Sequence, residues 1–115
     1  MKNLFLFFFM IFALSCSKDN QINICNTDEP LKDLEWLKSI VKSLKDNGSP
    51  SEIVVYDYNN NDIFFINQCV RCSDFVTSVY DCAGNEICKF GGLAGLNTCP
   101  EFSPVIEKTV LFRSN

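Results

Sequence analysis

The sequence predicts an α+β domain in which one N-terminal helix packs on an antiparallel β-meander and disulfides stabilise the fold. Three observations predict it. Apolar residues recur at helical spacing in one segment, β-branched and aromatic runs separated by turn residues follow it, and six of the seven cysteines lie within residues 25–99. A helix that covers one face of an antiparallel sheet is a common way to bury such a set of elements.

The helix is expected over residues 30–45, where apolar residues recur at three- and four-residue steps and form one stripe. Thr27 or Asp28 can cap its start, and Pro30 suits the first turn. Asn47-Gly48 is a stop signal. The stripe consists of Leu31, Leu34, Leu37, Ile40, Val41 and Leu44, with Trp36 at its edge.

Two hairpins and a final edge strand are expected after the helix. An Asn-rich turn at residues 59–62 closes the first hairpin, because Asn tolerates the positive φ that tight turns need. The second hairpin turns around Ala83-Gly84-Asn85, and residues 91–97 are expected to form a loop. The expected strands span residues 53–58, 63–66, 77–81, 86–90 and 108–112.

Cys16 marks the end of a predicted lipoprotein signal peptide. Lys2 supplies positive charge, and residues 4–14 form an uncharged apolar run. This run suits a signal peptide, which needs about 7–15 apolar residues, and is shorter than the roughly 20 of a membrane span. The sequence Ala13-Leu14-Ser15 precedes the cysteine, as at a lipoprotein cleavage site. The alternative is an ordinary secretory signal that leaves Cys16 as a plain thiol.

This interpretation divides the chain into three parts. Residues 1–15 are the signal peptide, residues 16–24 a polar tether and residues 25–115 a single small disulfide-rich α+β domain. Acyl chains on Cys16, palmitate among them, would anchor the protein to the membrane, since each buried CH₂ contributes about 0.8 kcal/mol. Ser17 after the cysteine favours the outer membrane. We therefore expect an outer-membrane lipoprotein of the cell envelope, and the sequence leaves open whether it faces the cell surface.

Composition excludes several function classes. The chain has no histidine, so a Ser-His-Asp triad is excluded. Its net charge is −4 and Arg71 and Arg113 are its only arginines, so no nucleic acid partner is expected, because polyanion binding needs clustered Lys and Arg. Asp57 and Asp62 flank a turn and are expected to be solvated. We expect no catalytic residue, no cofactor and no metal site.

The six cysteines after Cys16 predict three disulfides with fifteen possible pairings, because an even number in a small exported domain is typical of a disulfide framework. A Cys82–Cys88 bridge is disfavoured. In the expected hairpin Cys82 faces Ile87 and Cys88 faces Asp81, so the two cysteines point to opposite faces of the sheet. The other pairings stay open. The six are Cys25, Cys69, Cys72, Cys82, Cys88 and Cys99.

The cysteines also allow two other interpretations. Cys69-Val70-Arg71-Cys72 has the CxxC spacing of a redox motif, although such a motif is expected at a helix N-terminus and strands surround it here. With Cys82 and Cys88 the pair would instead form a four-thiolate zinc site, but the spacing is loose and export favours oxidation. The glycines of residues 91–95 lack the GK[ST] ending of a phosphate-binding loop.

Motifs along residues 25–112 carry a resemblance to a known family. They are Leu34-Glu35-Trp36-Leu37-Lys38 with Ile40, the hairpin of residues 53–66, the run of residues 79–88, Gly91-Gly92-Leu93-Ala94-Gly95 and Cys99-Pro100-Glu101-Phe102. In them the chain resembles a domain-of-unknown-function family of small Bacteroidota lipoproteins. The family tends to have a Gly-Asp-Gly turn where this chain has Leu96-Asn97-Thr98. The resemblance implies a compartment and a fold, and no activity.

The expected function is a non-catalytic binding or inhibitor module, held at the membrane through the lipid on Cys16. Its partner is expected to be an envelope or extracellular protein or glycan. Exposed loops on a disulfide-stapled scaffold, such as residues 91–97, are typical recognition surfaces. The alternatives are a thiol–disulfide redox protein that uses Cys69 and Cys72, and a structural zinc-binding domain.

Overall fold

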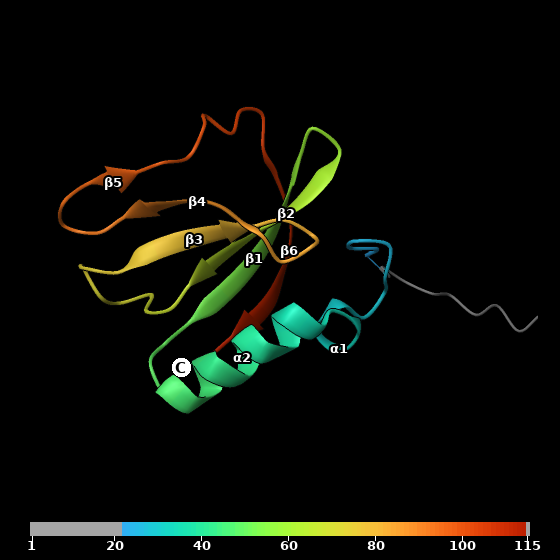
Figure 1. The fold of residues 1–115 in the computed structure, drawn as a ribbon, viewed down its shortest axis with the longest axis horizontal. Coiled ribbons are helices and arrows are strands. Elements are labelled where there is room, and N and C mark those ends of the chain that lie inside the picture. Colours follow the sequence, from blue (N-terminus) through green and yellow to red (C-terminus); the bar gives the residue numbers. More distant parts are fainter. Residues whose placement is uncertain (1–21, 115) are drawn as a thin grey trace, which may run out of the picture.

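A computed structural model of the chain describes residues 22–114. The signal peptide expected at residues 1–15, the predicted lipidation site Cys16 and residues 17–21 of the expected tether lie outside the described residues. The described part has the α+β architecture that the sequence predicts, with a helical region packed beside a six-stranded antiparallel sheet (Figure 1). None of its helices has the length and apolar character that crossing a membrane requires.

The helical region consists of two segments, so the prediction of one helix over residues 30–45 is wrong in this respect. Helix α1 spans Pro30–Asp33 and helix α2 spans Glu35–Asn47. Between them Leu34 has extended backbone, with φ −92° and ψ 104°. Its N–H still binds the Pro30 carbonyl, and its carbonyl accepts the Lys38 N–H at 3.0 Å. The chain therefore kinks at Leu34 while the apolar stripe continues towards the core.

The ends of the helical region follow the sequence signals with one difference. Pro30 occupies the first turn, and Gly48 ends α2 in the left-handed region with φ 71°, as expected. The N-cap position, however, belongs to Glu29 rather than to Thr27 or Asp28. The Thr27 hydroxyl instead accepts the Glu29 N–H at 3.1 Å and bonds the Asp33 carboxylate, so it braces the turn that leads into α1.

The sheet has the strand order β5-β4-β3-β2-β1-β6, so five consecutive strands form a meander and β6 returns to pair with β1. The final strand lies at the sheet edge, as predicted. Strand β5 was not predicted; it occupies part of the expected loop at residues 91–97. The strands are β1 Glu52–Tyr58, β2 Asn61–Asn67, β3 Val76–Tyr80, β4 Glu86–Gly91, β5 Leu96–Asn97 and β6 Ile106–Arg113.

The two predicted hairpins form with different connections. In the first, Tyr58 pairs with Asn61 and the turn is only Asn59-Asn60, both with positive φ. In the second, residues 81–85 connect β3 to β4, and Cys88 lies opposite Val79 with an irregularity in the pairing beside it. The expected pairing of Cys88 with Asp81 is therefore wrong, because the connection is longer and shifts the register.

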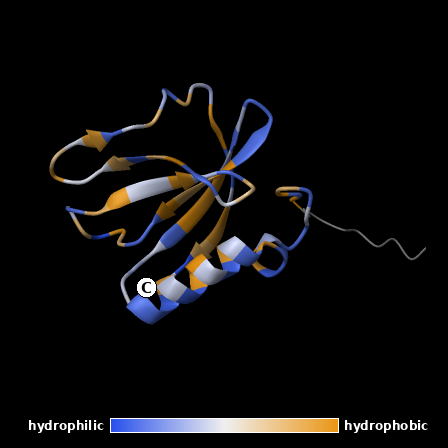
Figure 2. Cartoon of the chain, viewed as in Figure 1, coloured by the Kyte–Doolittle hydropathy of each residue, from blue (hydrophilic) through white to orange (hydrophobic). Residues whose placement is uncertain are grey.

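The face of the sheet beneath α2 buries the main core. Leu37 and Leu44 pack with Ile53 and Val55 of β1 and with Phe64 and Ile66 of β2. Figure 2 shows hydrophobic colouring on parts of α2 and along the strands beside it. The indole ring of Trp36 lies against Phe64 and Tyr80, with centroids 5.1 and 5.7 Å apart, and its N–H binds the Cys82 carbonyl at 3.0 Å. The predicted helix-on-sheet packing is confirmed.

The opposite face of the sheet is covered by an irregular segment that the sequence analysis did not assign, residues 98–105. Ile63, Val79 and Cys88 form a second buried cluster there. Phe102 and Val105 of the segment pack on it, together with Phe65 and Phe90 of the sheet. Both faces of the sheet are therefore buried at their centres, one by a helix and one by a loop.

Three disulfides hold these parts together, so the predicted disulfide framework is confirmed. Cys25–Cys82 joins the N-terminal segment to the connection between β3 and β4, Cys69–Cys72 closes a short loop after β2, and Cys88–Cys99 fastens the covering segment to β4. Cys82 and Cys88 are not bonded to each other. Ile24, placed in the tether by the sequence analysis, is only 1% exposed, so the packed chain begins at that residue.

Candidate functional site

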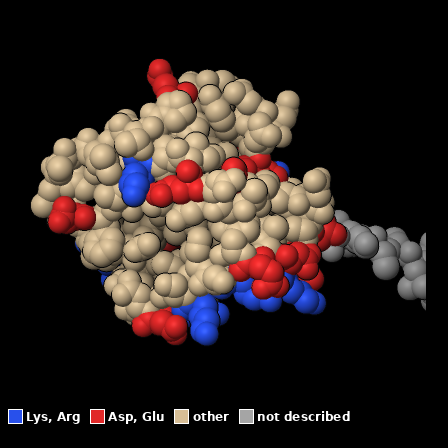
Figure 3. Space-filling view, viewed as in Figure 1, with Lys and Arg blue, Asp and Glu red and all other residues tan. Residues whose placement is uncertain are grey.

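A cavity of about 490 Å³ opens at one end of the sheet. Four parts of the chain line it: the turn end of the β1–β2 hairpin, the connection of residues 81–85, Ile87 of β4, and Pro100 and Phe102 of the covering segment. In Figure 3 charged side chains of both signs gather over the helices at the lower edge, and much of the surface over the sheet carries none. The volume lies within the roughly 300–1,000 Å³ of typical ligand pockets.

The walls of the cavity are mainly aromatic and aliphatic. Tyr58 and Phe102 meet edge to face with ring centroids 4.9 Å apart. The centroid of the Phe102 ring also lies 5.8 Å from that of Phe65, so Phe102 packs against the second core as well as lining the cavity. Ile63 and Ile87 complete the apolar lining, and Ile87 is 45% exposed at the rim. Such walls bind apolar groups by removing their surface from water.

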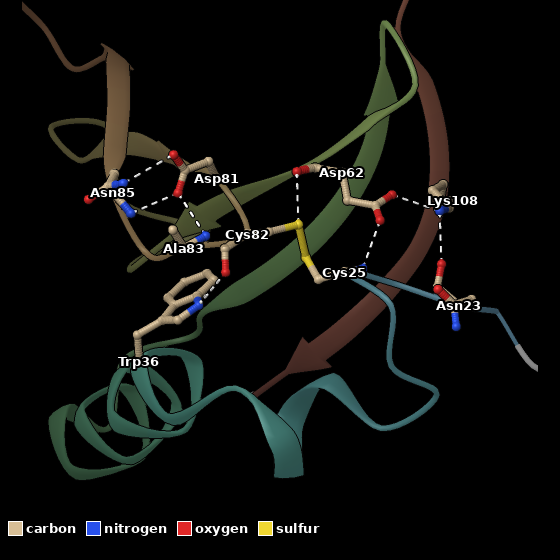
Figure 4. Close-up of a disulfide and its surroundings, with 9 residues drawn as sticks. All are labelled: Asn23, Cys25, Trp36, Asp62, Asp81, Cys82, Ala83, Asn85 and Lys108. Atoms are coloured by element: carbon tan, nitrogen blue, oxygen red, sulfur yellow. Dashed lines mark hydrogen bonds and ion pairs between the residues drawn. A yellow bond between two sulfur atoms is a disulfide. The ribbon is translucent and has the colours of Figure 1, made fainter.

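Asp62 connects the cavity to the N-terminal segment (Figure 4). One carboxylate oxygen accepts the Cys25 N–H at 2.9 Å and the other accepts from Lys108 Nζ at 2.7 Å. Lys108 also donates to the Asn23 carbonyl at 3.1 Å. The side chain of Asp62 is only 16% exposed, so the expectation that it is solvated is wrong. Its partners are distant in sequence, and no local signal could have found them.

Asp81 shapes the connection between β3 and β4. One of its carboxylate oxygens accepts the N–H groups of Ala83 and Asn85, both at 2.9 Å, and the other lies 3.4 Å from the Asn85 amide nitrogen. This is the turn geometry that Asp side chains favour. All three donors are neutral. No ion pair of Asp81 occurs within residues 22–114.

Two disulfides frame the cavity. Cys82 lines it and is bonded to Cys25, and Cys99, which precedes the lining residue Pro100, is bonded to Cys88. The connection also requires glycine at position 84. A Cβ there would lie 2.6 Å from Cγ of Trp36, and the φ angle of Gly84 is 87°. The connection thus packs against the Trp36 ring. The elements around the cavity are held by covalent bonds and close packing, which favours a preformed site.

The CxxC pair and the glycine loop lie away from this cavity. Cys69 and Cys72 are bonded to each other in the loop between β2 and β3, rather than at a helix N-terminus. Cys69 is buried, and Cys72 is exposed. The glycines after β4 form the turn into β5, where the Gly95 N–H binds the Gly92 carbonyl at 3.2 Å.

The four cysteines proposed as zinc ligands, Cys69, Cys72, Cys82 and Cys88, are distributed over three disulfides and do not converge. Within the described residues the group with metal-ligand proximity is instead Cys25, Asp62 and Cys82, whose ligand atoms lie within 4.8 Å of one another. Its two sulfurs are bonded to each other, so neither offers the thiolate that zinc binds. Cys82 Sγ lies 3.7 Å from the Asp62 carbonyl oxygen, and as a disulfide sulfur it makes a close contact there without donating a hydrogen.

Comparison with protein families matches residues 39–114 to DUF6970, a domain of unknown function. The chain belongs to this family. The match spans about two thirds of the chain and contains all six strands, both carboxylates of the cavity and five of the six disulfide cysteines. Cys25 and Trp36 precede it. No curated protein and no solved structure matches the chain.

Proposed function

We propose that the protein is a non-catalytic binding module of the cell envelope and that the cavity is its recognition site. The observation that carries the proposal is an apolar cavity of about 490 Å³ framed by two disulfides. Apolar walls with a few fixed polar groups are typical of binding sites. The absence of histidine from the chain supports binding over acid–base catalysis.

A protein partner is favoured over a glycan by the chemistry of the walls. Among the lining residues only Asn61, Asp62 and Asp81 carry polar side chains besides the Tyr58 hydroxyl. Both carboxylate oxygens of Asp62 and one of the two of Asp81 already accept hydrogen bonds from within the chain, so few positions remain for hydroxyl groups. A glycan presents many hydroxyl groups, each of which loses free energy when it is buried without a partner. Apolar peptide side chains lose nothing of this kind.

The proposal includes the lipid anchor at Cys16, which would place the cavity close to the bilayer. The described chain begins at Ile22, and the neighbouring Asn23 is bound to Lys108 beside Asp62 of the cavity. The six residues that follow Cys16, up to Ile22, can span no more than about 22 Å when fully extended. The binding site would then act near the membrane surface, and the anchor signal favours the outer membrane.

The anchor is tested by metabolic labelling with a palmitate analogue in the native host. The unmodified protein is expected to be labelled and to fractionate with the outer membrane, and Cys16→Ala to lose both properties. A mutant that is labelled as strongly as the parent would contradict the lipid anchor and leave the cavity proposal standing.

Binding is tested by capture of envelope proteins on the full mature chain, followed by mass spectrometry. Ile87→Gln changes an apolar residue on the rim, and Leu93→Gln changes an apolar residue that is 75% exposed and outside the lining. Both substitutions spare the core. A partner of the cavity should be recovered severalfold less by Ile87→Gln and unchanged by Leu93→Gln. Equal recovery by both variants would contradict the cavity as the recognition site.

The redox alternative receives its own measurement, because the CxxC disulfide lies partly at the surface. We expect the mature protein not to accelerate insulin reduction by a dithiol. Turnover that is lost in both Cys69→Ser and Cys72→Ser would overturn the binding proposal in favour of a thiol–disulfide enzyme.

A further inference from the structure

The two carboxylates of the cavity differ in their charge balance. Asp62 is paired with the Lys108 ammonium group at 2.7 Å, so the charges of the pair cancel. Asp81 accepts hydrogen bonds from neutral N–H groups only, and no Lys or Arg within residues 22–114 forms an ion pair with it. Among the residues that the structure describes, no Lys or Arg lines the cavity. Within residues 22–114, the cavity lining therefore carries one negative charge that no cation balances. The net charge of the chain is also negative.

We infer that the group entering the cavity is a basic side chain of a partner protein, lysine or arginine, with an apolar residue next to it in the partner's sequence. The inference rests on the proposed function and names the chemistry of that site. The carboxylate of Asp81 has room for a further partner, because its second oxygen has only the long 3.4 Å contact with the Asn85 amide. A cationic N–H group satisfies that oxygen and cancels the charge.

The aromatic walls strengthen the preference for a cation. Tyr58 and Phe102 both line the cavity, and ring faces attract ammonium and guanidinium groups. The long aliphatic stem of a lysine or arginine also packs well on apolar surface while its head remains beside a carboxylate. A carboxylate-bearing side chain would meet the opposite conditions, since Asp81 repels it and the cavity provides no unpaired cation.

The volume of the cavity indicates that an apolar residue of the partner enters it beside the basic one. A volume of about 490 Å³ is larger than a single extended basic side chain fills. Ile87 lines the cavity and is 45% exposed, so it gives a second side chain apolar surface to cover. The recognised motif is thus a pair of side chains, one basic and one apolar.

Three matched peptides test the inference. Ac-Phe-Lys-Leu-NH₂, Ac-Phe-Gln-Leu-NH₂ and Ac-Phe-Glu-Leu-NH₂ differ only in the charge of the central side chain. Each is titrated by NMR into the isotope-labelled full mature protein in micelles of an uncharged detergent. The indole N–H of Trp36 is the only one in the chain and binds the carbonyl of the lining residue Cys82, so its resonance reports on the cavity. The amides of Ala83 and Asn85 report on Asp81 itself.

The lysine peptide is expected to bind more tightly than the glutamate peptide by on the order of tenfold, with the glutamine peptide between them. Asp81→Asn should reduce the ratio between the charged peptides to nearly one and leave the glutamine peptide unchanged, because the Asn carbonyl can still accept the Ala83 and Asn85 N–H groups. Asp74→Asn is the matched control. Asp74 also accepts a backbone N–H, from Leu93 at 3.4 Å, and does not line the cavity, so the ratio should stay unchanged.

A second measurement uses the unmodified protein and so does not depend on the folding of a variant. The preference for the lysine peptide should fall as ionic strength rises from about 0.01 to 1 M, because salt screens charges at this partly open site. Equal binding of all three peptides, or a preference that salt does not change, would overturn the inference and leave the binding proposal intact. Absence of resonance shifts with every peptide at millimolar concentration would overturn the inference, and loss of partner capture specific to Ile87→Gln would still uphold the proposed function.

Discussion

The two faces of the sheet are buried in different ways. The helix face is covered by α2, whose stripe of apolar side chains presses Leu37 and Leu44 onto β1 and β2. The opposite face is covered by residues 98–105, which contain no helix or strand and pack chiefly through Phe102 and Val105. The helix satisfies its own backbone groups, whereas the irregular segment is joined to β4 by the Cys88–Cys99 bond and by hydrogen bonds between Thr98 and Lys89. The candidate binding cavity lies beside the second face.

This difference explains where recognition residues can gather. A helix that fills the groove above a sheet leaves little open volume, because its side chains interdigitate with those of the strands. The segment of residues 98–105 connects β5 to β6, covers the centre of the face and leaves a cavity at its border. Tyr58 and Phe102 border that cavity, and both also pack in the second core. The proposed binding site therefore lies beside the face of the sheet that residues 98–105 cover.

The largest effect is expected from the helix face. Leu37 is fully buried, so Leu37→Ala should lower the free energy of unfolding by about 2–5 kcal/mol, the usual range for a buried leucine. Denaturant unfolding of the oxidised protein measures it, with Ser39→Ala on the exposed side of α2 as the control. With a reductant present, the Leu37 variant should unfold near room temperature while the parent stays at least partly folded. If Leu37→Ala unfolded like the parent under both conditions, the helix-on-sheet packing would be wrong.

The second face is tested by removing its disulfide. The double variant Cys88→Ser, Cys99→Ser should lose about 3 kcal/mol, because the bond closes a loop with a sequence separation of 11. Hydrogen exchange should rise over residues 98–105 and β4 and stay low in α2. The control, Cys69→Ser with Cys72→Ser, removes a bond of separation 3 and should cost less. An equal rise in hydrogen exchange in α2 and in residues 98–105 would show that these two parts do not unfold independently.

The smallest expected effect is on the pH dependence of stability, and it involves one tyrosine from each face of the sheet. Burial raises the pKa of Tyr56 above 10.0, with Glu107 and Glu52 adding to the shift, and burial and Glu86 raise that of Tyr80, opposed by Lys89. Since the folded state favours the neutral phenol of each, this contribution to stability is complete below pH 10 and is lost as pH rises through the raised pKa values. The free energy of unfolding, measured from pH 8 to 12, should fall less steeply for Tyr56→Phe with Tyr80→Phe. Parallel curves would contradict these shifts.

The regular elements could be predicted because their signals are local. The stripe of α2, the Asn59-Asn60 turn and the edge position of β6 follow from side-chain periodicity and from backbone preferences of single residues. The kink at Leu34 and the register at Cys88 could not be predicted in the same way. Both depend on packing and on connections whose length the sequence leaves open, since a shift of one residue in a hairpin turns every side chain to the other face.

The sequence by itself determined the fold class, the number of disulfides, the absence of histidine chemistry and the family resemblance, because composition and short-range pattern are sufficient for each. Only the tertiary structure decided which cysteines pair, how the second face is covered and that Asp62, Asp81, Tyr58 and Phe102 border one cavity. These residues come from the ends of different strands and from an irregular segment. They lie close together because of the order of the strands and because residues 98–105 pass over the sheet. Side-chain periodicity along the chain cannot predict such long-range contacts.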